Sequence, residues 1–310
     1  MTAAVRSGPG SGRGSAKRIS IALFLLPAFA LYGVLVLLPI VQAASYSLYR
    51  WNGLKPLTDF VGLANYEKAL ADPVFLGAIS HNVLIIVLSI TVQIPFALGL
   101  ALMLNRRFRG RSLFRLLFFA PYVISEVITG IVFQLILLPD GLFDRGLDGL
   151  GLGAYTQGWL ADPKIVMLTM FVIISWKYFG FHMILLLAGL QGIPRELEEA
   201  AAIDGATRWQ AIRRITLPLL GPTIRVSVFL SMIGALQIFD LIWVTTRGGP
   251  VNASNTMATY MIDWGFRRTQ LGYGSAAAVI LFVAALILAL VYQRFVMRRD
   301  IDGAMTYGGA

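Results

Sequence analysis

Three ionisable residues interrupt otherwise apolar stretches of this chain: Glu126, Lys177 and Asp240. A charge at the centre of a membrane-length apolar segment costs about 3 kcal/mol or more, so it normally faces a cavity or a partner. Tyr122 precedes Glu126 by four residues, which places both on one face of a helix, and Tyr178 directly follows Lys177. Charged groups bind hydroxyls, and tyrosine rings pack against C–H faces. The set therefore predicts a cavity that binds a neutral, hydroxyl-bearing solute.

Polar and small residues at helical spacing before Asp240 extend this predicted pathway. The complete predicted set is Tyr122, Glu126, Lys177, Tyr178, Ser231, Gly234, Gln237 and Asp240. Other interpretations stay open. Glu126 and Lys177 would also suit a structural ion pair, and Gln237 would suit a hydrogen bond between helices. Asp240 would also reach interfacial water and cap the turn that follows it.

The composition argues against metal, redox and thiol chemistry. The chain has no cysteine, and its two histidines, His81 and His182, both lie in hydrophobic stretches. Thiolate metal sites and cysteine nucleophiles are thereby excluded, and we expect the histidines to form hydrogen bonds between helices. A membrane-embedded enzyme is disfavoured, because no paired catalytic residues are present.

The elements that carry these residues are predicted to be membrane-spanning helices. Hydrophobic residues make up 57% of the chain and charged residues 14%, whereas soluble domains carry about 25% charged residues. A span needs roughly 20 apolar residues in a helix. The sequence predicts an all-α polytopic membrane protein with six spans, over residues 19–41, 79–104, 112–138, 164–190, 219–245 and 271–295.

The distribution of lysine and arginine predicts the orientation. Seventeen of the 26 bases flank one side of the predicted spans, and eight flank the other. Basic loops stay cytoplasmic, so both termini are predicted to face the cytoplasm. The same asymmetry explains the net charge of +10 without nucleic acid. Residues 1–18 are predicted to form a disordered basic tail, residues 19–297 the span domain, and residues 298–310 a cytoplasmic tail.

One loop on the basic side, over residues 191–218, has the pattern of a helical hairpin. Pro194 suits the start of a helix, and the glutamates that follow it favour the positive end of the helix dipole. Gly205 can end this helix by adopting a positive φ. A second amphipathic stretch, Thr207–Ile215, leads to Pro218. Such a hairpin either docks into a groove on a partner or rests at the bilayer surface.

This loop resembles the EAA signature of the permease subunits of ATP-binding-cassette importers. The signature E-A-A-x3-G-x9-I-x-L-P is filled at every fixed position, from Glu199 to Pro218. The T-x-G-G-P turn of the carbohydrate-importing branch is matched after the fifth span. By resemblance, the residues that couple to the ATPase are Glu198, Glu199, Ala200, Ala201, Asp204, Gly205, Ile215, Leu217 and Pro218, and those of the outer turn are Thr246, Gly248, Gly249 and Pro250.

The resemblance covers most of residues 19–297 and is to permeases related to the maltose and glycerol-3-phosphate importers. It implies the type I permease bundle, with residues 191–218 as the coupling loop of a sugar importer in the bacterial inner membrane. Glu199 would be the polar anchor and Gly205 the bend. The implied partners are membrane lipid, a second homologous permease, two ATPase subunits and an extracytoplasmic sugar-binding protein.

No cofactor is expected in this chain, because it lacks the phosphate-binding motif G-x-x-x-x-G-K-S/T. ATP and magnesium would be bound by the ATPase. By the same resemblance, the positions that contact substrate in the maltose permease match seven residues here, although most of the side chains differ: Tyr122, Glu126, Lys177, Tyr178, Ser231, Gly234 and Ala235. The first alternative is a permease for glycerol-3-phosphate or another polar solute. The second is an ion-coupled secondary transporter with a proton site at Glu126 or Asp240.

Overall fold

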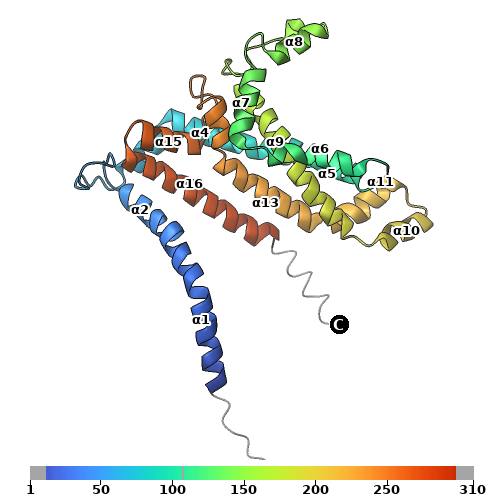
Figure 1. Ribbon diagram of the computed structural model, residues 1–310, viewed down its shortest axis with the longest axis horizontal. Helices are drawn as coiled ribbons and strands as arrows, with labels where there is room; N and C mark the ends of the chain where they lie inside the picture. The colour runs from blue at the N-terminus through green and yellow to red at the C-terminus, as the bar shows by residue number, and fades with distance from the viewer. Residues whose placement is uncertain (1–11, 107, 298–310) are drawn as a thin grey trace, which may run out of the picture.

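The computed structural model describes residues 12–106 and 108–297, and it is built almost entirely from helices (Figure 1). Within this described part, five helices are long and apolar enough to cross a membrane, and a strongly bent helix pair would make a sixth span. The five helices run over Ser20–Tyr46, Pro73–Leu104, Val166–Gln191, Arg208–Gln237 and Leu271–Met297. The all-α, multi-span prediction is confirmed.

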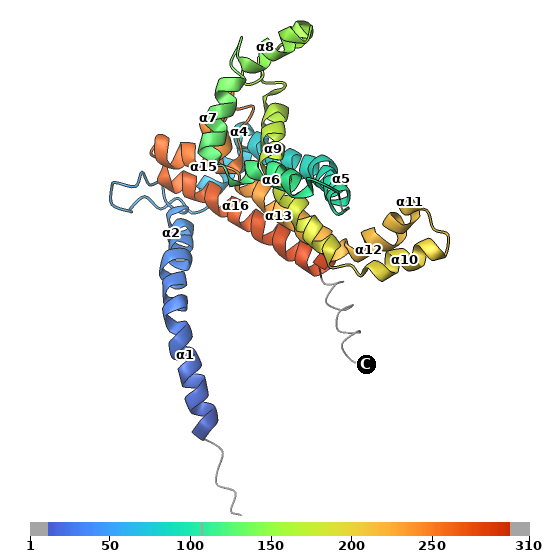
Figure 2. The same ribbon diagram turned by 45° about the vertical axis from the view of Figure 1, so that its right-hand side comes forward.

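The first span stands apart from the bundle (Figures 1 and 2). It consists of α1 (Gly12–Tyr32) and α2 (Leu38–Tyr46), joined by a π-helical turn. α2 packs against the bundle through α16 (Leu271–Tyr292). Residues 12–18, assigned to a tail in the sequence analysis, lie in α1. Residues 1–11 and 298–310 lie outside the described part.

The centre of the bundle is α9 (Val166–Gln191). In its most apolar 18-residue window 61% of the residues are buried, compared with 28% in the second span and none in the first. The second span comprises α4 (Pro73–Leu88) and α5 (Ile94–Leu104), with a π-helical turn at Ser89–Gln93. Leu186 and Leu190 of α9 pack with Ala97 and Ala101 of α5 in one buried cluster.

The third predicted span, 112–138, is not one rod. It consists of α6 (Arg111–Val123) and α7 (Glu126–Ile136), which meet at 96°. Ile124 and Ser125 are extended at the bend. Pro121 inside this stretch is compatible with a kink, but the size of the bend could not be predicted, since composition alone does not register a change of direction between two apolar helices.

The fifth predicted span, 219–245, is also interrupted. One long helix comprises α11 (Arg208–Ala211), α12 (Leu217–Leu219) and α13 (Gly221–Gln237). After an extended residue, Ile238, the chain resumes as α14 (Asp240–Thr245). The second helix of the predicted hairpin is thus continuous with the fifth span.

Shorter helices complete the structure: α3 (Ala64–Ala71), α8 (Leu142–Gly149), α10 (Arg195–Ile203) and α15 (Met257–Ile262). α15 anchors the end of the bundle opposite α10. Its Tyr260 donates a hydrogen bond to Asp72 and shares another, 2.7 Å long, with Tyr273. Burial, reinforced by these hydrogen bonds, raises the pKa of Tyr260, which therefore remains a protonated donor.

Candidate functional site

A cavity of about 380 Å³ opens in the bundle where the third and fifth spans are interrupted. The π-helical turn of the second span and α9 form its other walls. Seven of the eight predicted pathway residues line it: Tyr122, Glu126, Tyr178, Ser231, Gly234, Gln237 and Asp240. Ala235, implied by the family resemblance, also lines it. The structure therefore brings together side chains from positions more than 100 residues apart.

Carboxylates and aromatic rings face this cavity from two helix ends. Glu126 begins α7 and Asp240 begins α14, so each carboxylate lies in the first turn of a helix, where the helix dipole stabilises it. The Tyr178 hydroxyl donates a hydrogen bond to Glu126 Oε1. The Tyr122 ring stacks on Phe181, with centroids 5.0 Å apart. This arrangement offers hydrogen-bond acceptors beside an aromatic wall.

Lys177 is the one predicted pathway residue that does not line the cavity. It is 3% exposed, and its ammonium donates hydrogen bonds to the carbonyl oxygens of Pro121, Tyr122 and Ile124. These carbonyls belong to the last turn of α6 and to Ile124, which follows it; the helix stops here, so the N–H donors of a further turn are missing, apart from Ile124 N–H, which donates to Pro121 O at 3.3 Å. Within the described residues, Lys177 and Glu126 form no ion pair. Lys177 instead stabilises the bend that creates the cavity.

Two polar residues of the second span, Ser89 and Gln93, also line the cavity and were missed in the sequence. They are 2% and 3% exposed, and they belong to the π-helical turn of the second span. Their spacing of four residues within an apolar stretch indicates one polar face of a helix. Because both side chains are uncharged, this pattern is weaker evidence for a cavity than a charged residue such as Glu126. The hydrogen bond between helices that was expected of His182 is present, since its Nδ1 lies 2.8 Å from Ser227 Oγ on α13, and His182 also lines the cavity.

The predicted coupling residues form a helical hairpin that projects from one end of the bundle (Figure 2). Pro194 precedes α10, and Gly205 ends it with φ of +79°. The Ala206 N–H then bonds to Ala201 O at 2.9 Å. A capping box formed by Thr207 and Gln210 starts α11. The predicted helix, bend and helix are present.

The two sides of this hairpin differ in exposure. Ala201 is buried, and Glu198 accepts a hydrogen bond from Thr216 at 3.2 Å, so these residues hold the hairpin together. Glu199 and Ala200 are exposed, as are Asp204, Gly205 and Pro218, whereas Ile215 and Leu217 are half-buried. Ile203 and Leu197 are 87% and 41% exposed. Exposed apolar residues beside carboxylates suit a surface that docks onto another protein.

The predicted outer turn, Thr246 to Pro250, follows α14 and is tightly braced. Gly248 has φ of +81°, and the Gly249–Pro250 peptide bond is cis. Ser254, which is fully buried, donates to Gly249 O and lies 2.7 Å from Thr246 Oγ1. A side chain at Gly248 would overlap Asn255. These residues shape the turn, and none of them lines the cavity.

The fold and the sequence define the class of protein. The family model described as "Binding-protein-dependent transport system inner membrane component" matches residues 93–300. The chain belongs to this family of multi-pass membrane permease subunits. The predicted resemblance to importer permeases and the type I permease fold are thereby confirmed.

Individual relatives agree along nearly the whole chain. A probable ABC transporter permease protein of Pyrococcus horikoshii is 38% identical over 274 residues, covering 88% of this chain and 94% of the relative. The lactose transport system permease protein of Rhizobium radiobacter is 34% identical, covering 90% and 93%. In a bacterial alginate ABC transporter, crystallised with an alginate pentasaccharide-bound periplasmic protein, one chain superposes with a TM-score of 0.81 at 25% identity, covering 94% and 98%.

Proposed function

We propose that this chain forms part of the translocation pathway of an ATP-driven, binding-protein-dependent sugar importer. The observation that carries the proposal is the cavity between the broken third and fifth spans, with tyrosine rings beside Glu126, Gln237 and Asp240. Sugar hydroxyls require donors and acceptors, and sugar C–H faces pack on aromatic rings. The relatives named for lactose and for trehalose/maltose transport support the same substrate class.

The charge of the cavity favours a neutral solute over an anion. Its lining includes two carboxylates, and the lining residues include neither lysine nor arginine. A phosphate or sulfonate group would face Glu126 and Asp240 without a cation to pair with. Glycerol-3-phosphate is therefore the weaker candidate. The alternative of a different class, a proton-coupled carrier with its proton on Glu126 or Asp240, is disfavoured because the chain belongs to the binding-protein-dependent transport family.

In this proposal the α10–α11 hairpin contacts the ATPase and moves when the ATPase binds ATP. By family resemblance, the partners are a second homologous permease, two ATPase subunits that hold ATP and magnesium, and an extracytoplasmic sugar-binding protein. The hairpin and both termini would face the cytoplasm, as the basic loops indicate. ATP then drives transport because it favours one arrangement of the spans over the other.

The test is uptake of a saccharide panel into proteoliposomes that contain the complete transporter and its binding protein. We expect uptake that requires ATP and survives a protonophore. Glu199→Lys and Gly205→Val should reduce uptake to background while leaving membrane insertion intact. Glu67→Lys, at an exposed glutamate on α3, is the matched control and should transport normally. Uptake that collapses with the proton gradient, or survives Glu199→Lys, would contradict the proposal.

A further inference from the structure

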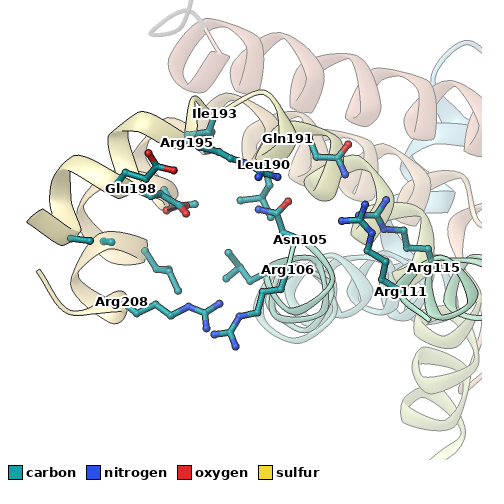
Figure 3. A pocket seen from close by; sticks show the side chains of 16 residues that line it. Asn105, Arg106, Arg111, Arg115, Leu190, Gln191, Ile193, Arg195, Glu198 and Arg208 are labelled. Carbon is teal, nitrogen blue, oxygen red and sulfur yellow. Dashed lines mark hydrogen bonds between the residues drawn. The ribbon is translucent and has the colours of Figure 1, made fainter. Parts of the chain in front are cut away.

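A cationic cavity lies between the bundle and the α10–α11 hairpin. Its volume is about 800 Å³, and five arginines line it: Arg106, Arg111, Arg115, Arg195 and Arg208. They come from the end of the second span, the start of α6, and both helices of the hairpin. Arg106 and Arg208 reach toward each other from opposite walls, and Arg111 lies beside Arg115 on another wall (Figure 3).

These arginines lack carboxylate partners among the residues that the structure describes, where the ion pairs join Arg50 to Asp59, and Arg267 and Arg268 to Asp263. Glu198 and Glu199 also line the cavity, but Glu198 accepts its hydrogen bond from Thr216. The Arg115 guanidinium donates to Leu104 O, and its Nε is buried without a partner. Like charges that converge on one cavity are relieved by an anion, and guanidinium groups bind phosphate strongly.

An apolar groove continues from this cavity, so a ligand that fills both would carry an apolar part beside its anionic group. The groove has a volume of about 950 Å³ and shares Arg106 and Arg208 with the cationic cavity. All of its other lining residues are apolar or aromatic: Leu100, Leu102, Met103, Leu104, Phe108, Phe114, Phe118, Trp209 and Ile212. Because α5 and α6 belong to spans, this groove lies along surface that a bilayer covers.

We propose that the two cavities together bind an anionic phospholipid. The phosphate lies between Arg106 and Arg208, and an acyl chain lies in the groove against Phe114 and Trp209. A free anion would leave the groove empty, and an acidic peptide would bring backbone groups into an apolar site at a cost. Basic pockets between membrane helices are suited to lipid headgroups. The lipid joins the second span to the hairpin, so its occupancy stabilises one position of the hairpin.

Native mass spectrometry of the full-length chain tests the site directly. Phosphatidylglycerol and phosphatidylcholine with identical acyl chains are the probes. We expect one phosphatidylglycerol per chain to survive detergent removal and phosphatidylcholine to be lost. Arg106→Gln combined with Arg208→Gln should weaken retention about tenfold or more, since each lost contact is a charge-assisted hydrogen bond. The matched control is Arg109→Gln with Arg213→Gln, at exposed arginines that line neither cavity.

Competition separates the lipid from other anions and does not depend on any variant. Inorganic phosphate and glycerol phosphate should fail to displace the lipid at equal concentration, because they cannot occupy the groove. Equal retention of both lipids, displacement by phosphate alone, or equal loss in the two double variants would overturn the proposal. A photoreactive side chain at Trp209 that labels a polypeptide and no lipid in the membrane-embedded complex would likewise assign the site to protein.

Discussion

Tyr178 and Glu126 form the most specific contact in the central cavity. The tyrosine hydroxyl donates to the carboxylate, and the ring lies beside Tyr122 with centroids 6.0 Å apart. The contact holds one carboxylate oxygen in place and leaves the other to accept from a solute. Glu126 therefore presents an oriented acceptor to the cavity, which a freely rotating side chain would not do.

Replacing Tyr178 with phenylalanine should weaken solute binding while preserving the packing of the ring. A hydrogen bond to a charged group contributes about 1.5–3 kcal/mol, so we expect the KM for uptake to rise about tenfold or more. Tyr155→Phe is the matched control, because Tyr155 is 65% exposed at the end of a short 3-10 helix outside the cavity. Uptake kinetics in proteoliposomes measure both variants. An unchanged KM for Tyr178→Phe would show that the hydrogen bond between Tyr178 and Glu126 does not contribute to solute binding.

Lys177→Met should lower stability with little direct effect on the cavity surface. The substitution keeps most of the buried side-chain volume but removes the side-chain donor from the carbonyls at the end of α6, of which only Pro121 O keeps a backbone donor, Ile124 N–H. We expect a loss of about 1–3 kcal/mol in the free energy of unfolding. Thermal unfolding of the purified chain measures it, with the exposed Lys164→Met as the control. If both lysines prove equally dispensable, the capping role is incorrect.

For single residues, the sequence predicted which side chains line the cavity better than it predicted what each side chain does there. Charges in apolar stretches identified Glu126 and Asp240 because burial without a partner is costly. The role of Lys177 could not be predicted, because its acceptors are backbone carbonyls exposed only by the bend in the third span. Gln93 was missed because a neutral amide in a span is ambiguous without knowledge of the face it occupies.

The helices α6 and α9 cross in close contact at Gly180, and the sequence alone does not reveal this contact. A Cβ added at Gly180 of α9 would overlap the backbone carbonyl of Phe118 on α6. Only glycine permits this approach of two helix backbones, as is common in membrane bundles. The contact seats α6 against α9 and thereby fixes one wall of the cavity.

Gly180→Ala should force α6 and α9 apart. We expect a loss of about 1–3 kcal/mol, since the obstructing atoms are backbone and cannot rotate away. Gly99→Ala is the control, because a Cβ at that position in α5 meets no atom within 4 Å. Melting temperatures of the two variants in one detergent give the comparison. A tolerated Gly180→Ala would mean that the helices separate at little cost.

Helix positions were predictable, but helix continuity was not. Span length and apolar composition located all six apolar stretches, and proline and glycine predicted the ends of α10. The bends after Val123 and Gln237 escaped prediction because both halves of each span are apolar, and Pro121 alone is compatible with a mild kink. Whether a proline kinks or breaks a span depends on partners, here on Lys177.

In the whole molecule, the buried apolar side chains that stabilise the fold lie in the bundle, whereas those of α1 are exposed. Phe24 on α1 is 85% exposed, whereas Phe75 on α4 is fully buried among residues of α15 and α16. A side chain contributes through burial only where it is covered. The apolar surface of α1 therefore requires lipid or another subunit.

Phe75→Ala and Phe24→Ala should consequently differ in effect. For the isolated chain in detergent, we expect Phe75→Ala to cost about 3–5 kcal/mol, because it leaves a cavity. Phe24→Ala should change the free energy of unfolding by less than about 0.5 kcal/mol. Chemical unfolding of the two variants provides the measurement. Equal losses would show that α1 folds back onto the bundle in solution.

The bend in the third span gives its two halves different neighbours. α6 packs on α9, which leads directly into the hairpin, while α7 packs on α14 beyond the interruption of the fifth span. Ile124 and Ser125 join the halves as a short elbow. A rigid rod in this place would have to tilt as a whole and would drag both neighbours with it. With an elbow, a displacement at the hairpin end can widen one mouth of the passage while the other mouth stays shut.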